Sequence, residues 1–228
     1  MATSLTVEGI AQPVRVIRRR GAKRATLSVS RATGAATMTL PPRMPMATAE
    51  AFARDQRDWL VARLDAMPAS IPFEDGTALP YRGRILRIVR REGRGVRLMG
   101  ERLEVGGSPE ALPGAVERWL KRQARICLRA RSEAHAQALD VTVRRIAIRD
   151  TRSRWGSCST TGTLSYSWRI VLAPDSVLDY LAAHEVAHLR EMNHSPRFWR
   201  HVRTLCPGFR DARDWLREKG TDLHRYGR

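Results

Sequence analysis

Residues 184–194 contain the feature that most restricts this chain, a histidine–glutamate pair followed by two further histidines. His184, Glu185 and His188 form the pattern H-E-x-x-H, and His194 follows six residues later. On an α-helix, residues i and i+4 lie on one face, one turn apart. Two imidazoles at that spacing can bind a single metal ion, with nitrogen–metal distances of about 2.0–2.1 Å. The motif therefore predicts a helix that holds a metal.

The third histidine can join the first two only if the helix ends soon after His188. Asn193 suits the turn that must follow, because Asn tolerates left-handed backbone angles. Three neutral histidines leave a fourth coordination position open, as in catalytic rather than structural zinc sites. We therefore expect one Zn²⁺ per chain, bound by His184, His188 and His194. The alternative is a solvated pair of histidines on a polar helix face, but the helix around them is largely apolar.

This site predicts a metal-dependent hydrolase. Zinc lowers the pKa of a bound water toward about 7 and polarises a carbonyl oxygen. Glu185 lies beside His184 on the helix, so it can take the proton of the attacking water and pass it to the leaving amine. The expected reaction is peptide-bond hydrolysis by a metalloendopeptidase, with Glu185 as the general base and no covalent intermediate.

The net charge of +18 favours a second function, because 41 basic residues outnumber 23 acidic ones. Strongly basic chains often bind nucleic acids. The excess is spread along the sequence, however, and nearly all of it is arginine: only Lys23, Lys121 and Lys219 are lysines. A basic nucleic-acid-associated module therefore remains an alternative to the enzyme, and the basic surface is a possible contact for a nucleic acid or a nucleotide.

Alternating and helical apolar patterns predict an α+β fold in two parts. Residues 1–107 are expected to form a β-rich subdomain with one helix, and residues 108–228 the catalytic domain that carries the histidine motif. The expected strands are 24–30, 36–40, 141–149 and 164–172, with a turn at 31–34. The expected helices are 48–67, 108–139 and 176–192.

Three segments together resemble the YgjP-like metallopeptidase family, which is related to the SprT-like and Wss-type zinc proteases. They are residues 154–159 (RWGSCS), 168–174 (WRIVLAP) and 184–199, and the hairpin within 24–42 resembles the opening segment of the family. The resemblance implies a compact zincin fold, zinc ligation by the three histidines, and catalysis by Glu185. Because the family has also been associated with nucleoside triphosphate hydrolysis, a zinc-dependent UTP pyrophosphatase is a further alternative.

Four residues near the motif are candidates for holding substrate. Arg154 and Ser157 could line the cleft beside the zinc, and Tyr166 and Trp168 lie on the strand expected at 164–172. That strand could be an edge strand that pairs with an extended peptide. The alternative for all four residues is ordinary packing around a tight turn and a sheet.

The remaining composition predicts a cytoplasmic protein without a membrane contact. Arginines interrupt the first 20 residues, so we expect no secretion signal. The longest stretch without a charged residue, 155–168, is too short to cross a bilayer. Three cysteines at irregular spacing fit a reducing compartment rather than a disulfide framework.

Overall fold

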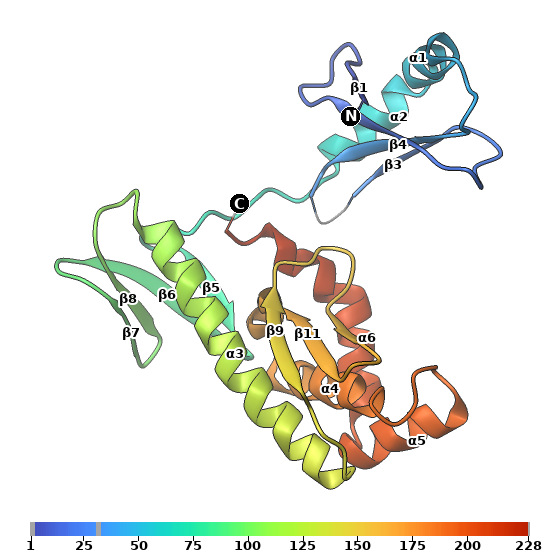
Figure 1. Cartoon of the computed structure of the whole chain (residues 1–228). Helices are drawn as coiled ribbons and strands as arrows, with labels where there is room; N and C mark the ends of the chain where they lie inside the picture. Colours follow the sequence, from blue (N-terminus) through green and yellow to red (C-terminus); the bar gives the residue numbers. More distant parts are fainter. Residues whose placement is uncertain (1–2, 31–32, 228) are drawn as a thin grey trace. The chain divides into compact units, whose positions relative to one another are not determined.

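The computed structural model describes residues 3–30 and 33–227, and its internal contacts divide the chain into two compact units, Met1–Ala69 and Ser70–Arg228. Both units combine helices with small sheets, which confirms the expected α+β class (Figure 1). None of the helices in the described part of the chain has the length and hydrophobicity that a bilayer-spanning segment requires.

The first unit is a four-stranded sheet with two helices packed on one face. Its strands are β1 (Thr3–Leu5), β2 (Val14–Arg18), β3 (Thr26–Val29) and β4 (Ala36–Leu40), in the order β1-β2-β4-β3. The helices α1 (Met46–Asp55) and α2 (Arg57–Asp65) follow. Alternation along the strands buries Val14, Val16 and Met38 against Ala49 and Leu60 of the helices.

Two expectations for this unit have different outcomes. The hairpin within 24–42 is confirmed, because β3 and β4 pair antiparallel from Thr26–Thr39 to Val29–Ala36. Of its expected turn, Arg31 and Ala32 lie outside the described residues. The single helix expected over 48–67 is instead α1 and α2, since the backbone of Gln56 leaves helical angles (φ −90°, ψ 11°) between them.

The second unit begins with a four-stranded sheet and the longest helix. Strands β5 (Ala78–Tyr81), β6 (Arg84–Arg91), β7 (Val96–Met99) and β8 (Arg102–Gly106) form the order β5-β6-β8-β7, and α3 (Leu112–Ala138) follows. Leu86, Ile88 and Leu103 of this sheet share a core with Val116 and Leu120 of α3. The contacts therefore divide the chain after residue 69 rather than at the expected boundary of 107, because the apolar face of the sheet is buried on α3.

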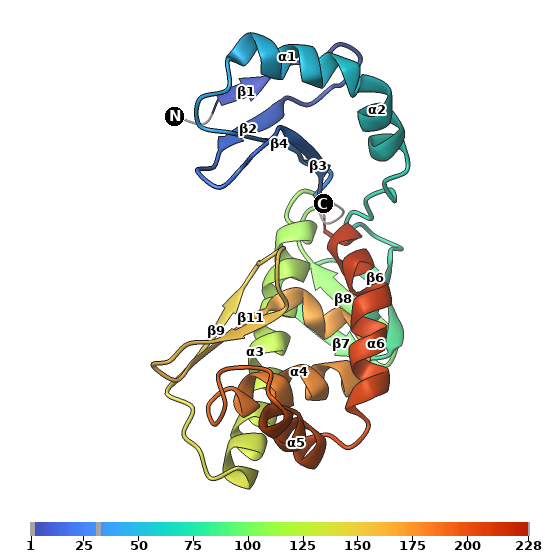
Figure 2. The ribbon, with the colours of Figure 1, turned by 90° about the vertical axis from the view of Figure 1, so that its right-hand side faces the viewer.

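The rest of the second unit is a small sheet followed by helical segments. The elements are β9 (Arg145–Arg149), β10 (Gly156–Cys158), β11 (Thr163–Ser167), η1 (Trp168–Leu172), α4 (Asp175–Ala187), α5 (Pro196–Leu205), α6 (Phe209–Lys219) and η2 (Gly220–Arg225). The three strands have the order β10-β11-β9, and helices lie on both sides of α4, which contacts α3 and α6 (Figure 2).

The strand expected over 164–172 differs from the observed structure in length and position. It ends at Ser167, and residues 168–172 form a short 3₁₀-helix whose side chains are all buried. It is also a central strand, because β11 pairs with β9 on one side and with β10 on the other. The expectation of an edge strand was therefore wrong, since both of its backbone edges are used within the sheet.

Candidate metal centre

Helix α4 carries the first two histidines and ends where the third needs it to end. His184 lies in its last turn and His188 is its C-terminal cap. The helix expected to reach residue 192 stops earlier, and two tight turns follow, in which the N–H of Leu189 donates to Val186 O and that of Arg190 to Ala187 O. The chain is thereby free to fold back.

The returning segment is fixed by two local hydrogen bonds. Ser195 N–H donates to Asn193 Oδ1 at 3.0 Å, and Phe198 N–H donates to Ser195 Oγ at 3.3 Å, so Ser195 caps α5. His194 lies between Asn193 and Ser195, and its ring lies close to that of His184 on α4. The turn that was expected at Asn193 therefore contributes both a change of direction and a side-chain acceptor.

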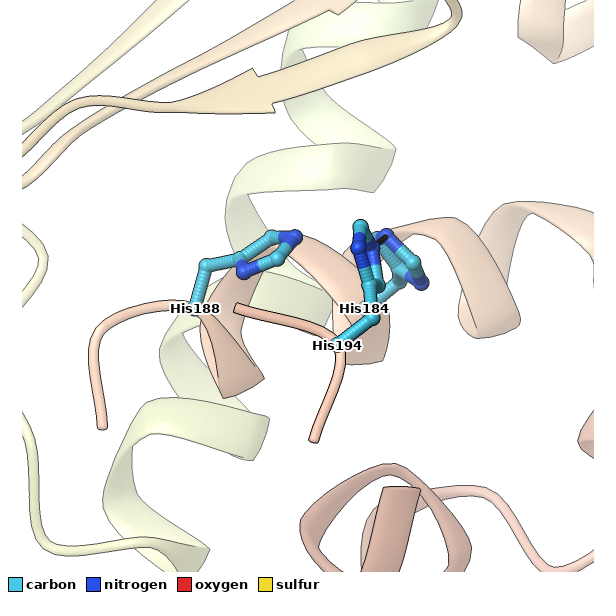
Figure 3. Close-up of side chains that lie close together, drawn as sticks. All are labelled: His184, His188 and His194. Atoms are coloured by element: carbon cyan, nitrogen blue, oxygen red, sulfur yellow. Dashed lines mark hydrogen bonds between the residues drawn. The ribbon is translucent and has the colours of Figure 1, made fainter. Parts of the chain in front are cut away.

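The structure brings the three histidines together (Figure 3). One ligand nitrogen from each ring lies within 4.8 Å of the other two, and the Nε2 atoms of His184 and His194 are 3.2 Å apart. Two nitrogens bound at 2.0–2.1 Å in a tetrahedral site lie roughly 3.3 Å apart. The donor set and its spacing therefore fit a divalent metal such as zinc.

Hydrogen bonds on the far side of two rings leave Nε2 available. His188 Nδ1 lies 3.1 Å from the carbonyl oxygen of Glu191, to which it can donate, and His184 Nδ1 lies 3.5 Å from the hydroxyl of Tyr180. Metal-binding histidines typically donate their other N–H in this way, which fixes the ring and its tautomer.

The side chain of Phe198 packs against all three imidazole rings. Its side chain is fully buried, and its centroid lies 4.9, 4.5 and 4.7 Å from those of His184, His188 and His194. Sequence reasoning did not assign Phe198 a role in the site. The sequence signal for such a role was its position, because Phe198 follows His194 by four residues and lies in the first turn of the helix that Ser195 caps.

Burial favours the neutral form of His184 and His188. It lowers the pKa of His184 to about 3, with a further contribution from the neighbouring His188 and His194 rings. It also lowers the pKa of His188, although the hydrogen bond to Glu191 opposes the change. Neutral imidazoles have the lone pairs that a metal requires.

Glu185 is almost completely buried, with 4% of its surface exposed, and it lies beneath β10. Burial raises the pKa of its carboxyl group to about 8, while the positive charge of Arg154 opposes the shift. A Cβ atom at Gly156 would lie 2.7 Å from Glu185 Cδ and 2.8 Å from Cγ. Only glycine leaves room for this carboxylate, a constraint that the sequence pattern did not reveal.

The four expected substrate residues fall into two groups. Arg154 is exposed near Glu185, and Ser157 is half-buried on β10, an edge strand. Tyr166 and Trp168 are buried, with 1% and 0% of their surfaces exposed, and the Tyr166 hydroxyl bonds to Ser132 Oγ at 2.9 Å. We therefore correct the expectation for Tyr166 and Trp168, because core side chains do not reach a substrate.

The chain matches a family model and is similar to a solved structure. The model of a family described as YgjP-like, metallopeptidase domain, matches residues 23–219. Among solved structures, the chain is similar to that of the metallopeptidase zymogen of Pyrococcus abyssi abylysin, with 25% identity and a TM-score of 0.37. That similarity covers 43% of this chain and 97% of the other. No curated protein sequence matches.

Proposed function

Because the chain belongs to the YgjP-like family of metallopeptidase domains, we propose that it is a zinc-dependent endopeptidase that cleaves peptides or proteins. The observation that supports this most strongly is the convergence of three imidazoles next to a buried glutamate. A divalent metal follows from the family, and the choice of zinc rests on the all-imidazole donor set.

His184, His188 and His194 would hold one zinc ion per chain. When bound, the ion supplies Lewis-acid chemistry, which polarises a carbonyl oxygen and makes water more acidic. The chain itself orients two of the rings, His184 through the Tyr180 hydroxyl and His188 through the Glu191 carbonyl. Phe198 gives the site an apolar wall.

Glu185 would serve as the general base. Glu185 follows His184 directly on α4, and its side chain is shielded from solvent. Its raised pKa brings it close to neutral pH, where a residue that both accepts and donates a proton is most effective. Glu185 would take the proton from the attacking water and pass it to the leaving amine.

The edge strand β10 would align the substrate. Among the described residues β10 pairs only with β11, so its other backbone edge is open to an extended peptide. Gly156, on this strand, lies over Glu185, and Arg154 lies just before the strand. A peptide paired with β10 would therefore pass close to the base, with Arg154 and Ser157 as its nearest polar contacts.

The test compares the wild-type chain with Glu185→Gln on unfolded protein and on UTP, with and without a metal chelator. We expect about one zinc per chain in both proteins, and cleavage of protein only by the zinc-loaded wild type. Cleavage by Glu185→Gln at the wild-type rate would exclude Glu185 as the base. Release of pyrophosphate from UTP without proteolysis would instead support the nucleotide alternative, and salt-dependent DNA binding without any hydrolysis would support the nucleic-acid module.

We also propose that the protein acts in the cytoplasm. Cys127, Cys158 and Cys206 are all free thiols, which fits a reducing compartment. Fractionation of cells that produce the full chain tests this proposal, and recovery outside the cytoplasm would contradict it.

A further inference from the structure

A cavity of about 540 Å³ opens beside His188. Its walls come from residues 141–144, from the 159–162 turn between β10 and β11, and from residues 188–192 after α4. We call it the side pocket. Because His188 belongs both to the metal centre and to this wall, whatever occupies the side pocket lies against one of the candidate metal ligands.

Arg144 is held in the wall of the side pocket by the 159–162 turn. Its backbone N–H donates to Gly162 O at 3.0 Å. Gly162 has a φ of +80°, and a Cβ atom there would lie 3.2 Å from Arg144 Cγ, so the stem of the arginine rests on the glycine. The position of this side chain is therefore set by the turn rather than by an ion pair.

Arg144 is exposed, and its guanidinium group has no partner among the described residues. Within residues 3–30 and 33–227, no ion pair or side-chain hydrogen bond involves its guanidinium group. None of the described residues that line the side pocket is acidic. A guanidinium presents several N–H donors in a fixed fork that matches a carboxylate. The wall is therefore complementary to a negatively charged group.

The rest of the lining suits a short hydrocarbon stem. Val141, Leu189 and Met192 contribute apolar surface, and Met192 is 49% exposed. Thr142 and Thr160 add hydroxyl groups that can donate to an acid. Glutamate combines such a stem with a terminal carboxylate, whereas lysine would place a second positive charge beside Arg144.

We propose that the side pocket binds an acidic side chain of the substrate, glutamate above all, next to the bond that is cleaved, and that Arg144 determines this specificity. The proposal rests on the proposed peptidase function and adds to it the class of residue that is recognised.

The first test measures kcat/KM on paired fluorogenic peptides that differ only by Glu or Gln at each position around the cleaved bond. We expect one position at which the wild type prefers Glu by about fivefold or more, the range of a charge-assisted hydrogen bond in a partly exposed site. In Arg144→Gln the Glu/Gln ratio should fall to about one, and Arg144→Glu should favour Lys there. Arg145→Gln is the matched control, since Arg145 is the next residue, is exposed as Arg144 is, and does not line the pocket.

The second test measures binding of the same peptides to zinc-loaded Glu185→Gln by calorimetry. A preference for the Glu peptide that disappears with Arg144→Gln would support the pocket, and if the zinc-loaded wild type cleaves none of the peptides, the proposed peptidase function is contradicted while the pocket stands. Cleavage with no Glu preference at any position, or a preference equally reduced by Arg145→Gln, would overturn the pocket and leave the function intact.

Discussion

Gly156 and Glu185 approach each other so closely that no side chain fits between the β10 backbone and the carboxylate: a Cβ atom at residue 156 would lie 2.7 Å from Glu185 Cδ. Gly156 does not take a left-handed conformation, so its requirement is one of space alone. The backbone of β10 therefore limits where the Glu185 carboxylate, carried by α4, can lie.

Gly156→Ala should displace Glu185 and lower kcat at least about tenfold, because small misplacements of a catalytic group have large effects on rate. Zinc content should remain near one per chain, since the atoms nearest to a Cβ at residue 156 all belong to Glu185 and none to a histidine. Stopped assays over a range of peptide concentrations separate kcat from KM. Gly208→Ala is the control, because a Cβ there meets no atom within 4 Å; equal losses in the two variants would contradict a specific role for Gly156.

Tyr180→Phe removes the hydroxyl that lies 3.5 Å from His184 Nδ1 while it keeps the buried ring. Loss of a partner behind a metal ligand typically costs 10- to 100-fold in metal affinity. We expect a loss of about tenfold for zinc, measured by competition with a chromogenic chelator. Tyr81→Phe removes a similar contact at 3.4 Å to Gln123, away from the site, and should leave zinc affinity unchanged. Unchanged affinity in Tyr180→Phe would show that the hydroxyl does not orient His184.

Phe198→Leu tests the support beneath the three imidazoles. Leucine keeps the site apolar but loses the ring whose centroid lies 4.5 Å from that of His188. We expect weaker zinc binding with a modest change in metal-free stability, whereas Phe198→Ala should destabilise the chain by about 3–5 kcal/mol. Thermal unfolding with and without zinc distinguishes these effects. Phe73→Leu, at a buried site that does not contact the histidines, is the matched control; an equal loss of zinc affinity there would contradict this role.

The Asp150–Arg169 pair predicts a loss of stability in acid. Burial alone would raise the pKa of Asp150, but the hydrogen bonds and charge of Arg169 outweigh it and hold this pKa below its usual range. Since the folded-state pKa is depressed, the contribution is complete above the ordinary value of about 4 and disappears as the pH falls through the lower folded value.

Asp150→Asn should therefore reduce stability at pH 7 by about 2 kcal/mol, because Arg169, with only 5% of its side chain exposed, loses its carboxylate. The difference from wild type should shrink below pH 4. Urea unfolding at pH 7, 5, 4 and 3 measures this. Asp58→Asn, at a carboxylate that is 92% exposed, should have little effect at any pH. Parallel pH curves for wild type and Asp150→Asn would contradict the prediction.

Local periodicity explains which features were predictable. The pairing of His184 with His188 follows from the repeat of one helix, and the return of His194 follows from a turn only a few residues long. The long helix over 112–138 and the β3–β4 hairpin also arise from neighbouring residues, so the sequence pattern located them within a few positions.

By itself, then, the sequence determined the candidate metal ligands, the glutamate beside them and the α+β class. Only the tertiary structure decided that β11 is central, that β10 is an edge strand, that Tyr166 and Trp168 are buried, and that residues 70–107 pack with α3. The physical reason is range: helix and hairpin geometry depends on residues a few positions apart, whereas strand order, the space left at Gly156 for Glu185 and the burial of an apolar face depend on segments that meet only when the chain is folded.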